Sequence, residues 1–503
     1  MSQTLKREEI MESQEYYKAE RAQKWRVQLR EKMKTKERTQ IERVPMPEND
    51  PMVRNKNHME VNIGLSEEEA MREASRCIDC ANPTCITGCP VGINIPKFVK
   101  KIEAGDFLGA AVVLKETNAL PAVCGRVCPQ ELQCESQCFY VQKLKHKQGV
   151  GIGNLERFAA DYERNSGKMS IPEVPPCNGI KVAVIGGGPA GLTVAGDMVK
   201  YGYDVTVFEA LHEIGGVLKY GIPEFRLPNE IVDVEVNNLK KMGVKFKTNF
   251  IVGKTATIDD LRKEGYQAFF VGSGAGLPNF MNIPGENGIG IFSSNEYLTR
   301  VNLMNAAKED YDTPVLRGKN VAVIGGGNTA MDSVRTAKRL GAERAMIIYR
   351  RSREEMPARV EEVKHAIEEG IEFMNLNNPV KYILDENGKV KSMILRKMEL
   401  GEPDSSGRRR PIPIEGSDYE VPVDIVVVAV GVSPNPLLPK SLPDLEVSEW
   451  GTIKVNERMQ SSIPDIFAGG DIVRGGATVI LAMGDGRKAA AGMHEYLQEK
   501  IKK

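Results

Sequence analysis

Eight of the nine cysteines of this 503-residue chain lie between residues 77 and 138. They form two groups with short internal spacings: Cys77, Cys80, Cys85 and Cys89, then Cys124, Cys128, Cys134 and Cys138. Thiolates at this density are ligands for iron–sulfur clusters or, alternatively, for zinc. A proline after Cys89 and another after Cys128 bring the pattern close to that of ferredoxins. The groups therefore predict metal sites, although spacing alone does not say which thiolates share a metal.

A glycine turn after a strand-like apolar run indicates a dinucleotide-binding site. The G-x-G-x-x-G fingerprint is formed here by Gly186, Gly188, Pro189, Ala190 and Gly191. Such glycines allow a tight turn and let the backbone approach a pyrophosphate at a helix N-terminus. Glu209 ends the next strand-like run, where it would accept hydrogen bonds from ribose hydroxyls and repel a 2′-phosphate. FAD or NAD therefore fits this site, whereas NADP does not.

The same plan returns further along the chain in the G-x-G-x-x-A form, with Gly325, Gly327, Asn328 and Thr329. Where an acidic residue would meet a free ribose hydroxyl, this second motif has Arg350 and Arg351. Two guanidinium groups suit a phosphate, so we expect NADP(H) at this site. The alternative is that both arginines only solvate a strand end.

A third glycine turn near the C-terminus favours a flavin at the first site. A buried, strand-like run ends in Gly470 and Asp471, whose carboxylate can meet the ribityl or pyrophosphate part of FAD. The helix expected at Thr478 and Val479 would then direct its N-terminus at the isoalloxazine ring. No cysteine follows Cys177, which excludes the dithiol chemistry of disulfide reductases here and sends electrons from the flavin elsewhere.

These motifs predict an α/β protein in which a helical N-terminal iron–sulfur domain precedes two Rossmann-like dinucleotide-binding domains. The pattern of glycine turns resembles the two-dinucleotide-binding flavoprotein reductases, and this resemblance implies that the NADP(H)-binding domain is inserted into the FAD-binding domain. The expected limits are a charged N-terminal arm at 1–60, the helical domain at 61–175, the FAD-binding domain at 178–312 and 446–503, and the NADP(H)-binding domain at 313–445. Within the arm, residues 1–43 predict a charged helix that is either solvated or partly disordered, or docks on a partner.

Charge and hydropathy exclude several classes of protein. The 68 basic and 68 acidic residues balance, which argues against a nucleic-acid-binding protein. No apolar run reaches the roughly 18 residues of a membrane span, and the polar N-terminus has no signal-peptide core. We therefore expect a cytoplasmic protein without a membrane anchor.

The cysteine groups, the segment GIGNLERF at 151–158 and both glycine motifs resemble the small (β) subunit family of NADPH-dependent glutamate synthase over about residues 60–503. This family includes the large subunit of NADH-dependent reduced ferredoxin:NADP⁺ oxidoreductase, an electron-bifurcating enzyme. The resemblance implies two [4Fe–4S] clusters, one on Cys77, Cys80, Cys85 and Cys138, the other on Cys89, Cys128, Cys134 and Glu156. Cys124 is then no ligand. The rival assignment gives Cys124 the place of Glu156.

The resemblance also assigns residues to both nucleotide sites. Around FAD it implies Glu209, Gly216, Val217, Arg226, Val252 and Asp471. Around NADP(H) it implies Asn328, Thr329, Arg350, Arg351 and Gly431. No catalytic acid or base is expected, because the flavin and the clusters carry the chemistry.

The resemblance further implies a hetero-oligomer with a second redox subunit, either a small flavin/iron–sulfur subunit or the glutamate synthase large subunit. The chain has no barrel-sized segment that would make glutamate, so it is expected only to deliver electrons. The amino-acid sequence at 354–373 and 477–490 resembles the large subunit of the bifurcating enzyme more closely, with the glutamate synthase subunit as the alternative. A non-enzymatic iron–sulfur redox sensor and a sulfide- or polysulfide-linked reductase are the other hypotheses.

Overall fold

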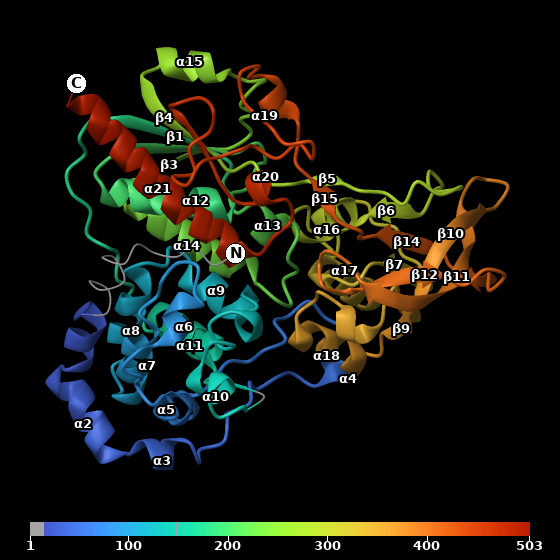
Figure 1. Ribbon diagram of the computed structural model, residues 1–503. Coiled ribbons are helices and arrows are strands. Elements are labelled where there is room, and N and C mark those ends of the chain that lie inside the picture. The colour runs from blue at the N-terminus through green and yellow to red at the C-terminus, as the bar shows by residue number, and fades with distance from the viewer. Residues whose placement is uncertain (1–14, 147, 503) are drawn as a thin grey trace.

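The computed structural model describes residues 15–146 and 148–502, which form one helical unit and two α/β units (Figure 1). The helical unit, called the cysteine-rich unit below, is followed by the first dinucleotide unit, and the second dinucleotide unit is inserted into the first. The sequence-based expectation of this fold class is confirmed. No helix among the described residues is long and apolar enough to cross a membrane.

The cysteine-rich unit is built from short helices, several of them started by side-chain caps. Its helices are α2 (Lys24–Lys32), α3 (Thr35–Arg38), α4 (Pro51–Arg54), α5 (Glu67–Ser75), α6 (Thr84–Thr87), α7 (Ile95–Glu103), α8 (Phe107–Lys115), α9 (Pro121–Val127), the 3₁₀ helix η1 (Gln130–Leu132), α10 (Phe139–Gln142) and α11 (Ile152–Asn165). Ser66 begins α5 with a capping box, because its hydroxyl accepts from Glu69 N while the Glu69 carboxylate accepts from Ser66 N. This cap holds the helix that leads into Cys77.

The described part of the N-terminal arm packs on the cysteine-rich unit. Residues 1–14, where the expected helix begins, lie outside the described residues. Arg26 in α2 and Arg38 in α3 are 2% and 1% exposed. Residues 15–43 are therefore not a freely solvated helix, because these arginines bind the chain's own acidic and carbonyl groups. Docking of the arm on a partner stays a prediction.

The first dinucleotide unit is a parallel sheet in the order β16-β4-β1-β2-β3. Its elements are β1 (Lys181–Ile185), α12 (Pro189–Lys200), β2 (Asp204–Phe208), α13 (Val217–Tyr220), α14 (Asn229–Lys241), β3 (Lys245–Lys247), α15 (Ile258–Lys263), β4 (Tyr266–Val271), α19 (Leu437–Lys440), β16 (Ile466–Ala468), α20 (Asp471–Arg474) and α21 (Val479–Ile501). Alternate β1 residues face opposite sides: Val182 and Val184 join a core shared with the cysteine-rich unit, whereas Ala183 and Ile185 join the other face. The helical unit is thus packed against this sheet by one continuous core.

The second dinucleotide unit repeats this plan in the order β6-β14-β7-β8-β9. Its elements are β6 (Ile291–Ser293), α16 (Ser294–Asn302), β7 (Asn320–Ile324), α17 (Asn328–Arg339), β8 (Arg344–Tyr349), the 3₁₀ helix η2 (Arg353–Glu355), α18 (Val360–Glu368), β9 (Glu372–Asn375), β10 (Asn377–Leu384), β11 (Val390–Pro403), β12 (Arg409–Pro413), β13 (Tyr419–Pro422) and β14 (Ile425–Val428). Strands β10 to β13 form an antiparallel sheet beside it.

Two antiparallel strands join the dinucleotide units, β5 (Leu277–Pro278) and β15 (Val432–Ser433). Strand β6 pairs with β14 in the second sheet, although the expected limit at residue 312 assigns it to the FAD-binding domain. Because β6 belongs to the second sheet, the chain passes from the first dinucleotide unit to the second at the β5–β15 pair. The other domain limits stay proposals.

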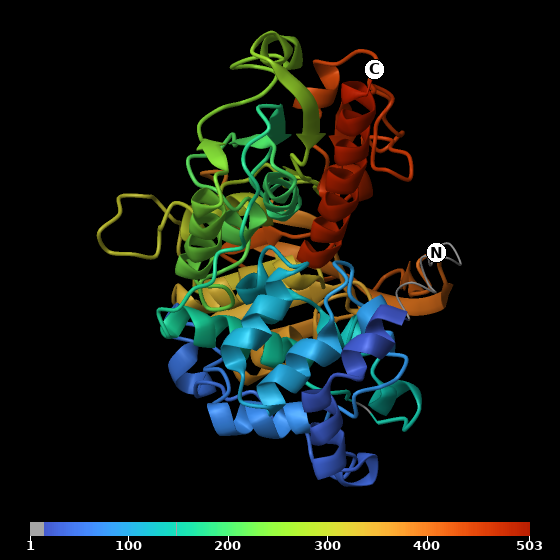
Figure 2. The ribbon, with the colours of Figure 1, turned by 90° about the vertical axis from the view of Figure 1, so that its left-hand side faces the viewer.

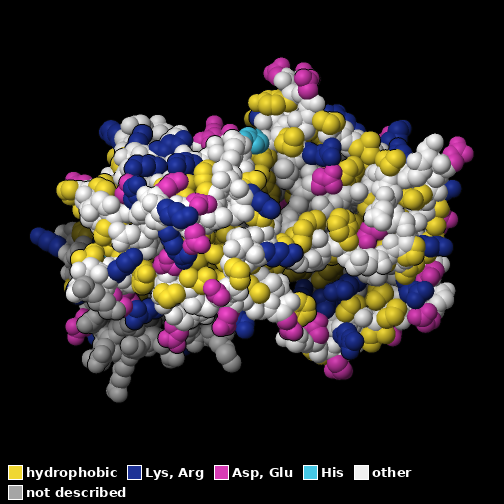
Figure 3. All heavy atoms as spheres, turned by 90° about the horizontal axis from the view of Figure 1, so that it is seen from above, with side chains coloured by type: hydrophobic (Ala, Val, Ile, Leu, Met, Phe, Trp, Pro, Cys, Tyr) yellow, Lys and Arg dark blue, Asp and Glu magenta, His cyan; other side chains and the backbone are white. Residues whose placement is uncertain are grey.

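Helix α21 connects the first dinucleotide unit to the cysteine-rich unit. Figure 2 shows this long helix beside the first sheet, with its lower end meeting the blue helices. At that end an added Cβ on Gly484 would lie 3.0 Å from Pro90, which follows Cys89. Basic and acidic side chains are interspersed over the face drawn in Figure 3, as the balanced composition predicts.

Candidate functional site

One cavity gathers four thiols of the cysteine-rich unit and is called the first cysteine site below. It is lined by Cys77, Cys80, Cys85 and Cys138, with apolar neighbours such as Ile95 and Val99. Burial, helped by neighbouring thiols, raises the pKa of Cys80 to about 12, and burial also raises the pKa of Cys85. Buried thiols of this kind become thiolates when a bound metal supplies positive charge. The structure brings together the first ligand set, whose role as ligands stays a prediction.

The second cysteine site contains Cys89, Cys128 and Cys134 near the carboxyl group of Glu156. Burial raises the pKa of Cys89 to about 11, and the Glu156 charge acts in the same direction. Burial raises the pKa of Glu156 to about 8, opposed by a hydrogen bond of 2.8 Å from Asn118 Nδ2. Within the described residues this carboxyl group has no cationic partner. It therefore suits a metal ligand, because the metal would supply the missing charge.

Cys124 lies beside the same site. Its contact with Cys128, together with burial, raises the pKa of Cys128 well above the usual range. The sulfur of Cys124 also lies 3.7 Å from Asn118 Oδ1 and 3.5 Å from Met483 Sδ of α21. Asn118, which sequence reasoning missed, therefore contacts both candidates for the fourth ligand position, and Glu156 stays the predicted one.

The first glycine turn forms an open cradle. Gly186 has φ of 103°, and an added Cβ at Gly191 would lie 1.9 Å from the Gly186 carbonyl oxygen, so both positions require glycine. At Gly188 the nearest atom to an added Cβ is the Cα of Gly216, 4.0 Å away. Open space thus lies over the start of α12, at Pro189, where the helix dipole favours an anion. This cradle fits a pyrophosphate.

Glu209 is held beside this cradle by main-chain amides. Its Oε2 accepts from Gly187 N at 2.7 Å, and its Oε1 accepts from Leu211 N at 2.8 Å. Burial raises the pKa of Glu209. The remaining lone pairs of the carboxylate can accept ribose hydroxyls. Val217 lies nearby at the start of α13.

The C-terminal glycine turn returns to the first turn of α12. Gly470 has φ of 77°, and an added Cβ there would lie 3.2 Å from the Cβ of Ala190. Burial raises the pKa of the adjacent Asp471 to about 6. Thr478 caps α21, which starts at Val479. Gly470, which was predicted to lie near the flavin, thus packs against Ala190 at the start of α12.

The second glycine turn has the same form. Gly325 has φ of 140°, and the nearest atom to an added Cβ at Gly327 is 4.0 Å away. Asn328 Oδ1 accepts from Arg359 N at 2.9 Å, which ties the first turn of α17 to the segment before α18. Thr329 lies in that same first turn.

The two predicted phosphate-binding arginines have different surroundings. Arg350 is exposed and makes no hydrogen bond or ion pair with the part of the chain that the structure describes. Arg351 is buried, and its guanidinium binds the Asp404 carboxylate at 2.5 Å and the Arg409 carbonyl at 2.8 Å. Arg350 therefore has a guanidinium available for a phosphate, whereas Arg351 anchors the β11–β12 hairpin.

Three other residues predicted to bind a nucleotide, Arg226, Val252 and Gly431, lie in different surroundings. The guanidinium of Arg226 binds Asp332 at 2.7 Å and Glu362 at 3.0 Å, both in the second dinucleotide unit. Its side chain thus joins the two units, and its contact with FAD stays a prediction. Val252 is buried in the core of the first unit, and Gly431 follows β14 with φ of 109°.

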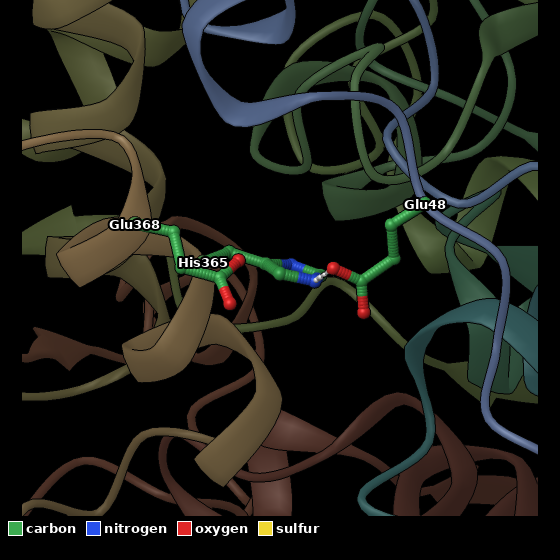
Figure 4. Close-up of side chains that lie close together, drawn as sticks. All are labelled: Glu48, His365 and Glu368. Atoms are coloured by element: carbon green, nitrogen blue, oxygen red, sulfur yellow. Dashed lines mark ion pairs between the residues drawn. The ribbon is translucent and has the colours of Figure 1, made fainter.

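A junction of charged groups lies between α18 and the segment before α4 (Figure 4). His365 Nε2 lies 3.2 Å from Glu48 Oε2, and Glu368 lies close to both. Arg54 lies 3.1 Å from Glu48 and 2.6 Å from Glu368, and Lys364 lies 3.0 Å from Glu48. These cations already balance the carboxylates, so we interpret the group as an ion-pair junction.

Two family descriptions match consecutive parts of the chain. Residues 54–168 match dihydropyrimidine dehydrogenase domain II with its 4Fe-4S cluster. Residues 180–486, more than half of the chain, match pyridine nucleotide-disulphide oxidoreductase.

Relatives match nearly the whole chain. It is 38% identical over 465 residues to the glutamate synthase [NADPH] small chain of Escherichia coli, an alignment that covers 91% of this chain and 98% of that protein. The chain belongs to the glutamate synthase small-chain family. The small chain of Azospirillum brasilense is also 38% identical, with 90% and 95% covered. The beta subunit of the NADP(+)-dependent formate dehydrogenase of Moorella thermoacetica is 38% identical, with 82% and 60% covered.

A solved structure shares the fold of the two dinucleotide units. Mycobacterium tuberculosis FprA in complex with NADPH matches with a TM-score of 0.55 and 19% identity, covering 65% of this chain and 86% of FprA. The glutamate synthase small-chain family member described here is thus an NADP(H)-dependent flavoprotein oxidoreductase whose cofactors are FAD, NADP(H) and two [4Fe–4S] clusters. The open glycine cradles and the gathered thiols fit these groups.

Proposed function

We propose that the chain carries electrons between NADP(H) and a partner redox subunit, as the large subunit of an electron-bifurcating ferredoxin:NADP⁺ oxidoreductase. FAD held at the glycine turn of residues 186–191 and at Glu209 would supply hydride exchange with NADP(H) and single-electron exchange with the iron–sulfur clusters. The chain's own residues bind and orient these groups and supply no catalytic acid or base.

The observation that carries the electron-transfer proposal is the contact between α21 and the second cysteine site. Met483 Sδ lies 3.5 Å from Cys124 Sγ, and Gly484 packs on Pro90, next to Cys89. Helix α21 therefore connects the predicted flavin site directly to the second cysteine site. The first cysteine site is close to the second, since the charge of Cys85 acts on Cys134.

The alternative is the electron-donating subunit of NADPH-dependent glutamate synthase. The nearly complete alignment with the glutamate synthase small chains of two bacteria favours this alternative. The amino-acid sequence at 354–373 and 477–490 favours the bifurcating enzyme. Both roles need a hetero-oligomer.

Isolation of the native complex distinguishes these roles. We expect a small flavin/iron–sulfur protein to copurify with the chain. A companion of amidotransferase size would instead assign the chain to glutamate synthase.

As a test of electron transfer itself, NADPH added anaerobically to the purified chain should bleach the flavin band. Failure of this bleaching in a flavin-containing preparation would contradict both roles.

A further inference from the structure

The N-terminal arm, taken as residues 15–43, lies against the loop that carries the first two predicted cluster ligands. Figure 1 shows α2 and α3 on the outer side of the cysteine-rich unit, away from the two sheets. The family resemblance begins at about residue 60 and assigns this arm no role. Its contacts with the loop indicate what it does.

Asp79, in the middle of the Cys77–Cys80 loop, is the centre of these contacts. It is fully buried and has φ of 54°, in the left-handed region that non-glycine residues adopt only where their surroundings hold them. Its carboxylate binds the guanidinium groups of Arg26 and Arg30. Its carbonyl oxygen accepts from Arg21 Nε at 2.7 Å. The arm thus holds both the side chain and the main chain of the residue between two ligands.

The start of the same loop is held by two more cations. Arg38 Nη1 donates to the carbonyl of Ser75 at 2.5 Å and lies 3.5 Å from that of Cys77. Lys100 Nζ also donates to the Cys77 carbonyl. The Glu103 carboxylate forms ion pairs with the Arg38 guanidinium and the Lys100 ammonium group and so holds both in position.

Positive charge exceeds negative charge around this loop. The five cations are Arg21, Arg26, Arg30, Arg38 and Lys100, and the two paired acids are Asp79 and Glu103. Most of these groups are buried, so water screens them poorly. An excess of positive charge stabilises the more negative, reduced state of a nearby redox centre.

The arm also contacts the neighbouring helix α7 and the thiols. Glu20 lies 3.3 Å from Lys97, and Lys101 lies 5.0 Å from the centre of the Trp25 ring. Tyr17 is close enough to Cys85 and Cys89 for charge on these thiols to add to the effect of burial in raising the Tyr17 pKa. Tyr17 thus packs against the core of the cysteine-rich unit.

We propose that residues 15–43 are a clip that holds the Cys77–Cys80 loop, with Arg26 and Arg30 as positioning residues for the cluster at the first cysteine site. The inference rests on the proposed function only in that this site holds a redox cluster. The clip keeps Asp79 in its strained conformation, retains the cluster and raises its reduction potential relative to an unclipped loop.

The test uses the full-length chain purified anaerobically with its clusters. Arg30→Gln removes one guanidinium from Asp79, Arg30→Lys restores the charge, and Arg26→Gln removes the buried contact. Lys32→Gln is the matched control, because the Lys32 side chain is exposed on the same helix and makes no hydrogen bond or ion pair with the described residues. The first cluster is identified as the signal that is missing from Cys80→Ala in electron paramagnetic resonance.

We expect both glutamine variants to shift the signal of the first cluster and to make its midpoint potential more negative, with the second cluster unchanged. Iron loss to a chelator from the first site should be about tenfold faster, the ratio that corresponds to one lost charge-assisted hydrogen bond. Arg30→Lys should recover part of each change, and Lys32→Gln should behave as wild type.

If the glutamine variants match Lys32→Gln in signal, potential and iron loss, the clip proposal is wrong. If Arg26→Gln does not accumulate as folded protein, Arg30→Gln decides, since its side chain is partly exposed. A wild-type chain without iron would refute the proposed function itself, and the clip with it. Normal clusters in wild type with unchanged variants would refute the clip alone.

Discussion

Two side chains compete for the fourth ligand position of the second cysteine site. Glu156 is buried without a cationic partner among the described residues. Cys124 lies beside Cys128 and contacts Asn118, which also binds Glu156. Burial keeps the Glu156 carboxyl group largely protonated near neutral pH. A bound metal would favour the deprotonated form, so Glu156 stays the predicted ligand.

Glu156→Gln should therefore change the spectrum of one cluster only, whereas Cys124→Ala should leave both. A carboxylate is a harder ligand than a thiolate, so its loss alters the potential of the cluster that it binds. Electron paramagnetic resonance of both variants checks this. The opposite outcome, two intact clusters in Glu156→Gln and one lost in Cys124→Ala, would assign the site to Cys124.

At the second nucleotide site, Arg350→Gln should raise the KM for NADPH by roughly 10- to 100-fold, the usual loss for a charge-assisted hydrogen bond. The KM for NADH should change little, because NADH has no 2′-phosphate. Steady-state kinetics with both nucleotides measure this. Arg408→Gln, at a partly buried arginine of the β11–β12 hairpin, is the control. Equal effects on NADPH and NADH would contradict the assignment.

Burial raises the pKa of Glu235 to about 7, although the amide of Ala122 donates to its carboxylate at 3.0 Å. In the unfolded chain the carboxyl group loses its proton near pH 4.5, whereas the folded chain keeps it until about pH 7. Stability therefore falls as the pH rises through this window, by at most about 3 kcal/mol.

Glu235→Gln should remove this part of the pH dependence, since an amide cannot ionise. Denaturant unfolding of the cluster-containing protein between pH 5 and pH 8 measures it. Glu230→Gln, on the exposed face of the same helix, should keep the wild-type slope. An identical slope in all three proteins would show that Glu235 ionises normally.

At the scale of elements, the glycines of one turn have different tasks. An added Cβ at Gly191 collides with the main chain, whereas one at Gly188 enters open space. Gly191→Ala should therefore impair folding. Gly188→Ala should fold and lose FAD, because only the cofactor occupies that space.

Circular dichroism and flavin content of the purified variants separate these outcomes. Gly341→Ala, at a surface helix end in the left-handed conformation, controls for the general cost of replacing glycine. Full flavin retention by Gly188→Ala would mean that the pyrophosphate lies elsewhere.

The glycine turns and their strands were predictable because each depends on a few adjacent residues. Gly186 and Gly325 both adopt positive φ, as the spacing indicated. The arm was harder to predict. Its signal is the four-residue spacing of Arg26 and Arg30, which puts both on one helix face, but their acceptor lies 49 or more residues away.

At the scale of the whole molecule, ion pairs join the units. Arg54 is 1% exposed and binds Glu48, Glu368 and Glu369, so it connects the segment before α5 to the second dinucleotide unit. Arg226 joins the two dinucleotide units in the same way.

Arg54→Ala should destabilise this junction by about 3–5 kcal/mol, because three acidic groups lose a shared buried partner. We expect a lower Tm and faster proteolysis between the units. Lys364→Gln removes a half-exposed contact to Glu48 and should cost less than about 1 kcal/mol. Equal Tm values for the two variants would show that the junction does not hold the units together.

The sequence by itself determined the parts whose chemistry is local. These are two glycine turns, the acidic or basic residues at the ends of the strands that follow them, and closely spaced thiols that indicate iron–sulfur clusters or zinc. Tertiary structure decided which of those groups meet. It brought Cys138 to Cys77, turned Arg351 toward Asp404 while leaving Arg350 exposed, and laid the arm on the Cys77–Cys80 loop. The physical reason is that short-range spacing constrains the backbone nearby, whereas the partner of a buried charge or thiol depends on how distant elements pack.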